Sequence, residues 1–302
     1  MERRTFLAAL GTALAATRIP LQGTEPVAGS ARITLLHTND THSHIEPLPQ
    51  GSGAHSGKGG MARRATLVKE LRKELGNVLL LDSGDVFQGT PWFNLYKGKM
   101  DYRLMSLVGY DAVTLGNHDF DNGVEGLLAA MEEATFPFVS ANLDCSGAPA
   151  LAKRVQPYLV KSLPGIKVGL TGLCVSFKGL VAPKNHEGVI WRDPVASVTP
   201  VVQHLREREK VDLVVVLSHL GHDMKGQAMD DLTLAKAVPG IDAILGGHTH
   251  TFLDQPVRIA NGARETLIQQ VGFGGVHLGR LDFTVAKGKV LACAGGPIEV
   301  RA

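Results

Sequence analysis

The sequence contains few cysteines and few aromatic residues, and both shortages exclude classes of protein. Its three cysteines, Cys145, Cys174 and Cys293, are odd in number and far apart, so they cannot form the disulfide framework of a small secreted protein. Cys174 lies in an apolar run and is expected in the core. Aromatic residues make up only 5% of the chain, too few for a base-stacking surface.

Concentrated charge and long hydrophobic runs are also missing. The formal net charge is +2, with the two signs mixed along the chain and no long Lys/Arg block. A nucleic acid polymer is therefore not an expected partner, since proteins that bind the phosphate backbone concentrate their basic residues on one face. The apolar run over residues 6–16 is too short to span a bilayer, so we expect no stable membrane insertion.

The first 30 residues have the pattern of an export signal. The charged start Glu2-Arg3-Arg4 precedes the apolar run, which contains the small-residue site Ala13-Leu14-Ala15. The segment Arg3-Arg4-Thr5-Phe6-Leu7 resembles the twin-arginine signal, which directs folded proteins to export. An ordinary secretory signal is the alternative, and the cleavage position stays open because residues 28–31 offer a second site. We therefore expect a periplasmic or secreted protein whose residues 1–30 are not part of the fold.

Helical and strand patterns alternate after residue 30, and strand patterns dominate the end of the chain. Helices are predicted over residues 61–75, 92–107, 122–134, 195–209 and 227–237. Strands are predicted over residues 33–37, 78–81, 111–115, 138–140, 158–162, 167–175, 211–217, 241–245, 266–271, 276–285 and 289–300, the last three as an antiparallel ending. This mixture predicts an α/β sandwich with mixed sheets covered by helices. No linker divides residues 31–302, so we expect one domain there.

Polar side chains that can bind metal ions follow five of the predicted strands. They are Asp40 and His42, then Asp85, Asn117 with His118, His219, and His248 with His250. Loops that leave the carboxyl ends of strands in open α/β sheets converge in one crevice, so we expect these side chains to meet. Asp40/His42 and His248/His250 are each spaced two residues apart, which in an extended chain places both side chains on one side. Each pair is therefore expected to hold one ion.

The chemistry of these candidate ligands predicts two metal ions. Carboxylate, imidazole and amide oxygen without thiolate favour Mn, Zn, Fe or a similar divalent ion. Without His118, which is a catalytic candidate, seven candidate ligands remain. They are too many for one tetrahedral ion, which predicts two ions with Asp85 between them and open positions for water and substrate. Taken singly, each residue has an ordinary explanation in a turn or loop. The prediction rests on their recurrence at successive strand ends.

The motifs that contain these residues resemble one known superfamily. They are Asp40-Thr41-His42, Gly84-Asp85, Gly116-Asn117-His118-Asp119, Ser218-His219 and Gly247-His248-Thr249-His250. Together they resemble the calcineurin-like metallophosphoesterases. Residues 33–45, Gly59-Gly60-Met61-Ala62-Arg63 and residues 117–121 are more specifically similar to the 5′-nucleotidase branch. The chain departs from that branch at Asp119, where Glu is usual, and at His250, where some members have Gln.

The resemblance implies a fold, a ligand set and a mechanism. The fold is the metallophosphoesterase-type α-β-β-α sandwich of two mixed sheets flanked by helices. One ion is held by Asp40, His42, Asp85 and His250, and the second by Asp85, Asn117, His219 and His248. On this resemblance, the two ions would promote ionisation of a shared water that attacks phosphorus. His118, paired with Asp121, protonates the leaving alkoxide or stabilises the transition state.

The resemblance also implies what is missing and which substrate to expect. Nucleotidases of this branch usually carry a second domain that recognises the nucleoside, and the sequence stops at Ala302. We expect a small phosphate ester as substrate, with a nucleotide resting on analogy alone, and either a broad specificity or a separate chain that supplies such a domain. Two alternatives stay open: a phosphodiesterase or cyclic-nucleotide or nucleotide-sugar hydrolase using the same site, and a non-catalytic metal-binding subunit.

Overall fold

The computed structural model describes residues 29–262 and 264–302. The export signal predicted for residues 1–30 therefore lies almost wholly outside the described residues. Among the helices that are described, none is long and apolar enough to cross a membrane.

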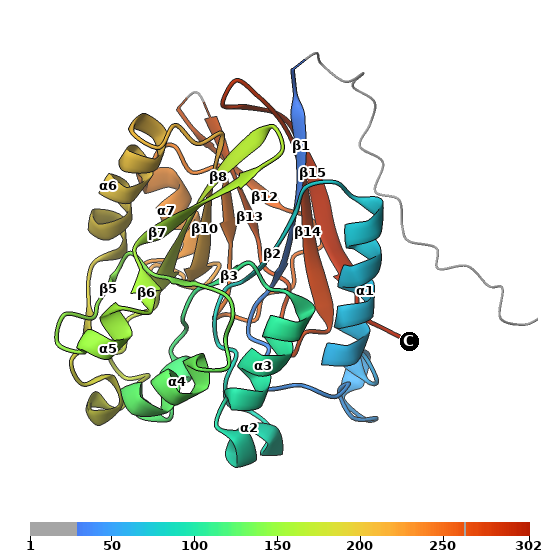
Figure 1. Cartoon of the computed structure of the whole chain (residues 1–302), viewed down its shortest axis with the longest axis vertical. Helices are drawn as coiled ribbons and strands as arrows, with labels where there is room; N and C mark the ends of the chain where they lie inside the picture. The colour runs from blue at the N-terminus through green and yellow to red at the C-terminus, as the bar shows by residue number, and fades with distance from the viewer. Residues whose placement is uncertain (1–28, 263) are drawn as a thin grey trace, which may run out of the picture.

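Two mixed β-sheets pack face to face and form the centre of the fold (Figure 1). The first sheet has the strand order β15-β14-β1-β2-β3-β4-β6. Its strands are β1 (Ala31–Thr38), β2 (Val78–Asp82), β3 (Ala112–Val113), β4 (Phe138–Val139), β6 (Val155–Gln156), β14 (His277–Ala286) and β15 (Lys289–Glu299). Strands β1, β2, β3, β4 and β6 run parallel, whereas β14 is antiparallel to β1 and β15 is antiparallel to β14.

The second sheet has the order β12-β13-β11-β10-β8-β7. Its strands are β7 (Tyr158–Leu163), β8 (Ile166–Cys174), β10 (Leu213–His219), β11 (Ala243–Leu245), β12 (Val257–Asn261) and β13 (Arg264–Gln269). Strand β10 is buried along its whole length, as its nearly continuous apolar sequence predicts for a central parallel strand. A small separate sheet pairs β5 (Leu143–Asp144) with β9 (Ile190–Trp191).

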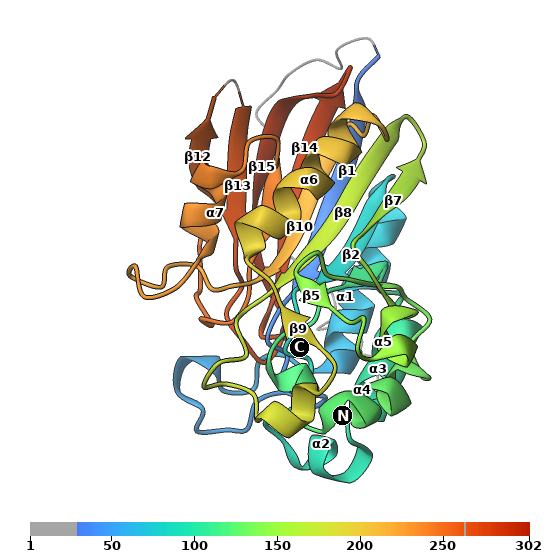
Figure 2. The same ribbon diagram turned by 90° about the vertical axis from the view of Figure 1, so that its left-hand side faces the viewer.

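Helices cover the outer face of each sheet, so the layers are helix, sheet, sheet and helix (Figures 1 and 2). The α-helices are α1 (Met61–Glu74), α2 (Pro91–Tyr96), α3 (Lys99–Val108), α4 (Gly123–Met131), α5 (Pro149–Ala152), α6 (Pro194–Glu207) and α7 (Asp231–Ala237). Three apolar clusters fill the spaces between the layers: one beneath α1, α3 and α4, one between the sheets, and one beneath α6 and α7. The predicted sandwich of two mixed sheets flanked by helices is confirmed.

The helix predicted over residues 92–107 is two helices, α2 and α3. Lys97 and Gly98 between them have φ values of 53° and 85°, a left-handed conformation that ends a helix. A Cβ at position 98 would lie 2.2 Å from the Phe87 ring, so the chain passes this ring too closely for any residue except glycine. The prediction was wrong because helical periodicity continues through a break that tertiary packing imposes.

The antiparallel ending predicted for the tail is wrong in part. Strand β14 pairs with β15 as expected, but β13 belongs to the other sheet, where it is parallel to β11 and antiparallel to β12. Strand β12 was not predicted. The segment between β13 and β14 therefore crosses from one sheet to the other.

The start of helix α4 agrees with the helix predicted over residues 122–134, but its first turn is not capped by a side chain. Helix α4 begins after Asn122, whose side chain makes no capping hydrogen bond. Asp230 and Asp193, by contrast, cap α7 and α6 through their carboxylates.

Candidate metal centre

The strand ends bring the predicted ligand residues together in two groups, and each group takes residues from both sheets. Asp40, His42 and His250 form the first group, and Asp85, His219 and His248 form the second. In each group the possible ligand atoms lie within 4.8 Å of one another. His248 and His250 therefore belong to different groups, which corrects the expectation that this pair holds one ion. The bridging role of Asp85 stays a prediction.

In the first group, the Nε2 atoms of His42 and His250 lie 3.1 Å apart. The Oδ1 atom of Asp40 is 3.3 Å from Nε2 of His250 and 4.0 Å from Nε2 of His42. The ligand atoms thus point at one another, although two ring nitrogens and a carboxylate oxygen gain little from such contact unless a proton or a cation lies between them.

The second group is deeper in the protein. Nε2 of His219 is 3.1 Å from Oδ2 of Asp85 and 3.9 Å from Oδ1 of Asp40, so the two groups adjoin. Both carboxylates are almost fully buried, and His219 is completely buried. His248 lies beside His219, with 5.3 Å between the ring centroids, and its backbone N–H donates to the carboxylate of Asp40 at 3.0 Å.

Two of these histidines have their ring orientation fixed by a backbone carbonyl. Nδ1 of His42 donates to the carbonyl oxygen of Phe87 at 3.0 Å, and Nδ1 of His219 donates to that of Ser83 at 2.7 Å. Each contact places the proton on Nδ1 and leaves the lone pair on Nε2, as metal-binding histidines require.

The backbone at the ligands is unusual. Five residues of the two groups have positive φ values: Asp40, His42, Asp85, His248 and His250, between 48° and 75°. Side-chain-bearing residues adopt this region rarely, and such conformations concentrate at functional sites. The chain is therefore not extended here, which is why alternation along a strand did not predict how His248 and His250 are grouped.

The electrostatics of the centre fit a divalent cation. Burial disfavours the charged form of His219, yet the carboxylates of Asp85 and Asp40 outweigh it and raise the pKa of His219 to about 10. The negative charge of the two carboxylates beside Nε2 would also attract a metal ion. Burial and the nearby His219 lower the pKa of His248 to about 4, which keeps its ring neutral and its lone pair available.

Asn117 and His118 adjoin these two groups. The Asn117 side-chain oxygen is buried without a hydrogen-bond partner, which costs free energy unless a ligand is bound there. Nδ1 of His118 donates to Asp121 at 2.9 Å, and this hydrogen bond raises the pKa of His118. The His118 ring packs edge-on against that of His42, with centroids 5.4 Å apart, and its backbone N–H donates to Asp85 at 2.8 Å.

The supporting roles of two further residues were not predicted from the sequence. Asp119 accepts four backbone N–H groups, those of Gly116, Asp85, Val86 and Phe87. Asn185 donates its side-chain N–H to the backbone oxygen of Asp121 at 2.9 Å. Asn185 is 64 residues from Asp121 in sequence, and no local pattern indicates this contact.

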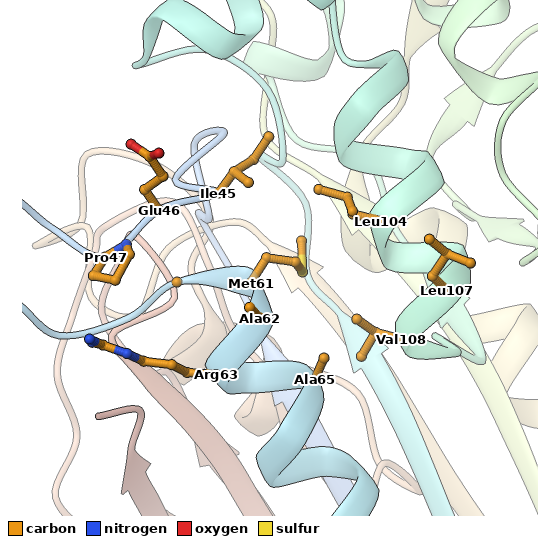
Figure 3. A pocket seen from close by; sticks show the side chains of 11 residues that line it. Ile45, Glu46, Pro47, Met61, Ala62, Arg63, Ala65, Leu104, Leu107 and Val108 are labelled. Atoms are coloured by element: carbon orange, nitrogen blue, oxygen red, sulfur yellow. The ribbon is translucent and has the colours of Figure 1, made fainter. Parts of the chain in front are cut away.

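A separate apolar pocket lies between α3 and the start of α1 (Figure 3). Its volume is about 580 Å³, and Met61, Leu104 and Leu107 contribute to its wall. None of the predicted site residues lines it. The candidate metal centre is therefore identified by its converging side chains, and this apolar pocket is not part of it.

Comparison with known proteins agrees with this geometry. Residues 33–252 match the family model described as calcineurin-like phosphoesterase. The chain is 37% identical to 5′-nucleotidase of Rattus norvegicus over 90% of its own length and 50% of that protein, and 35% identical to snake venom 5′-nucleotidase of Naja atra over 89% and 54%. The crystal structure of a 5′-nucleotidase precursor from Thermus thermophilus superposes with a TM-score of 0.81 at 36% identity, covering 89% of this chain and 55% of that one.

The chain thus spans about half the length of the curated relatives it matches. The matched segment contains all nine predicted site residues and both groups of the metal centre. This chain belongs to the calcineurin-like phosphoesterase family.

Proposed function

We propose that this chain is a hydrolase of phosphate monoesters that works with two divalent ions, of Mn, Zn, Fe or a similar metal. The observation that carries the proposal is the position of His118. Its ring packs against the first ligand group, belongs to neither group, and is oriented by Asp121. A histidine held by a carboxylate beside a metal centre is suited to proton transfer.

The two ligand groups would hold the ions in the grouping that the family resemblance implies, in which Asp85 is also expected to contact both ions. Asp40, His42 and His250 would bind one ion, and Asp85, His219 and His248 would bind the other with Asn117. When bound, such ions supply positive charge to the phosphoryl oxygens and promote ionisation of the attacking water. The protein fixes the ring orientation of His42 and His219 through the carbonyl oxygens of Phe87 and Ser83.

His118 supplies the proton that the leaving group needs. The hydrogen bond from Nδ1 to Asp121 orients the ring and raises the pKa of His118, which favours the imidazolium form. As the bond between phosphorus and the ester oxygen breaks, Nε2 donates its proton to that oxygen, and the water oxygen forms the new bond to phosphorus. Before proton transfer, the same positive ring stabilises charge on the phosphoryl group.

The experiment is a substrate panel with the purified protein after loading with Mn²⁺ or Zn²⁺. Phosphomonoesters, including nucleoside monophosphates, are compared with diesters, cyclic nucleotides and nucleotide sugars. We expect turnover of monoesters, and a loss of about 10²–10⁴-fold in kcat for His118→Ala with an unchanged metal content.

The outcomes separate the alternatives. Preferential turnover of diesters, cyclic nucleotides or nucleotide sugars would replace the monoesterase assignment. A lack of turnover with every metal and substrate would leave only a metal-binding role. Nucleoside monophosphate hydrolysis with a low KM by this chain alone would contradict the expectation that it has broad specificity or needs a separate chain.

We also propose that the protein is exported by the twin-arginine route, on the basis of Arg3-Arg4 and the apolar run after it. Replacing both arginines with lysine should keep the protein inside the cell, whereas an ordinary secretory signal should tolerate this exchange because it needs only positive charge. Export of the lysine variant at the normal level would instead indicate an ordinary secretory signal.

A further inference from the structure

The candidate ligand His250 is held differently from His42 and His219. Those two rings are fixed through Nδ1 by backbone carbonyls. The His250 ring instead stacks on the ring of Phe273, with centroids 5.2 Å apart and an angle of 22° between the planes. The side chain of His250 is 41% exposed, so it has more freedom to rotate than the other ligands unless this stacking restrains it.

Phe273 itself belongs to a firmly attached loop. Residues 272–275 lie between β13 and β14, where the chain crosses between the sheets. The carbonyl oxygen of Gly272 accepts from the Asn39 side chain at 2.6 Å, and the N–H of Gly274 donates to the backbone oxygen of Asp40 at 2.7 Å. The ring that supports His250 is therefore tied to the backbone of a second ligand of the same group.

The backbone of this loop permits the arrangement only because of its glycines. Gly272 has a φ of 79°, and a Cβ there would lie 2.1 Å from the ring of Phe252. Phe252 packs against Phe273 with 6.1 Å between centroids, and His55 stacks on Phe252 at 4.7 Å. Phe273 is half-buried, and its position is set by the backbone hydrogen bonds of its own loop, which do not involve Phe252.

We propose that Phe273 is a positioning residue of the metal centre, which holds the imidazole of His250 so that Nε2 stays aimed at the first ion position. This inference rests on the two-ion centre of the proposed function. Stacking fixes the plane of the His250 ring whatever its protonation state. It directs Nε2 of His250 toward Oδ1 of Asp40, 3.3 Å away. An aromatic pair of this kind corresponds to roughly two- to tenfold in a binding constant.

The test measures metal binding directly, without using catalysis. Metal-free protein is titrated with Mn²⁺ by calorimetry for the wild type, Phe273→Leu, Phe273→Tyr and Phe252→Leu. Phe273→Leu removes the stacking ring and keeps a large apolar side chain, and Phe273→Tyr restores the ring. Phe252→Leu is the matched control, because Phe252 lies in the same cluster and stacks on His55 instead of His250. Phe273→Met takes the place of the leucine variant should that variant not fold.

We expect the wild type and Phe273→Tyr to bind two ions alike. In Phe273→Leu, one of the two ions should bind roughly two- to tenfold more weakly while the other keeps its affinity within about twofold. Phe252→Leu should leave both affinities within about twofold of the wild type.

Wild-type affinity for both ions in the Phe273→Leu and Phe273→Met variants would overturn the inference and leave the proposed function standing. Equal weakening by Phe252→Leu would also overturn it, since the effect would then be general packing. A wild type that binds no ion would contradict the proposed function itself.

Discussion

The carboxylate of Asp119 accepts the backbone N–H of Asp85 at 3.1 Å, so that a buried side chain of the loop after β3 fixes the backbone of the loop after β2. The same carboxylate also accepts the N–H groups of Val86, Phe87 and Gly116. Asp119 thereby shapes both the loop that presents Asp85 and the turn before Asn117.

Removing this carboxylate should destabilise the protein strongly. Asp119→Ala leaves four buried N–H groups without their acceptor, each with a desolvation penalty of about 1–3 kcal/mol; allowing for relaxation and water entry, we expect a loss of about 3–5 kcal/mol in the free energy of unfolding. Urea denaturation of the metal-free protein measures it. Asp254→Ala, at an exposed position, is the control and should change stability by less than about 0.5 kcal/mol. A loss below about 1 kcal/mol for Asp119→Ala would show that the four N–H groups find other acceptors, such as water, without the Asp119 carboxylate.

Gly116 should be required for metal binding because of its close approach to Asp85. A Cβ at position 116 would lie 2.2 Å from Oδ1 and 2.6 Å from the backbone nitrogen of Asp85. Gly116→Ala must therefore displace a ligand, and we expect a loss of affinity for one ion of about tenfold or more in a calorimetric titration, about 1.4 kcal/mol. Gly76→Ala, where a Cβ would meet nothing within 4 Å, should bind metal normally. Equal affinities for the two variants would argue against this steric requirement.

Chelation should lower the thermal stability of the wild type. Ions that bind only the folded protein stabilise it by about 2.7 kcal/mol per site at about a hundred times the dissociation constant. We expect EDTA to lower the unfolding temperature and Mn²⁺ in excess over the chelator to restore it. In Asp85→Asn, which removes a carboxylate charge from the centre, the shift should be much smaller. A chelator effect of the same size in both proteins would place the stabilising ions elsewhere.

Stability should fall between about pH 4 and pH 7 through the buried carboxyl group of Asp101. Burial raises the pKa of Asp101 to about 7 from its ordinary 3.8, although a hydrogen bond from Ser43 partly offsets the shift. In this pH window the unfolded chain releases the proton while the folded protein keeps it, so stability is highest below the unfolded pKa and is lost as pH rises.

Asp101→Asn should remove this dependence. The free energy of unfolding of the variant minus that of the wild type should rise by about 2–4 kcal/mol from about pH 4 to about pH 8, because each unit of pKa shift corresponds to about 1.36 kcal/mol. Urea denaturation at the two pH values gives the difference, and exposed Asp254→Asn serves as its control. A constant difference between Asp101→Asn and wild type across the range would mean that Asp101 titrates normally in the folded protein.

The convergence of the candidate ligand residues is predictable from sequence because each follows an apolar strand, and parallel strands bring their carboxyl ends to one edge. The residues that support the ligands are not predictable in this way. Phe273 stacks on His250, and Asn185 contacts Asp121, only because loops from distant parts of the chain pack together. The identity of these partners depends on tertiary structure, and neither residue type is unusual in a loop.

The fold shows the same division between local and non-local information. The alternation of helix and strand is a local pattern, and it predicted the layers correctly. The pairing of β13 was not predictable, since an apolar strand fits either sheet and its partner β11 is selected by packing in the assembled sandwich. The break at Gly98 depends likewise on the ring of Phe87, which belongs to an earlier loop of the chain.

The division of each ligand group between the two sheets has a mechanical consequence. The first group joins the loop after β1 to the loop after β11, and the second joins the loop after β2 to the end of β10. Apolar packing resists sliding only weakly because it has no direction, whereas coordination bonds have fixed lengths and angles. With ions bound, a force that shears one sheet across the other would be borne first by the ligands, and the end of the sandwich that carries the chemistry would also be its strongest end.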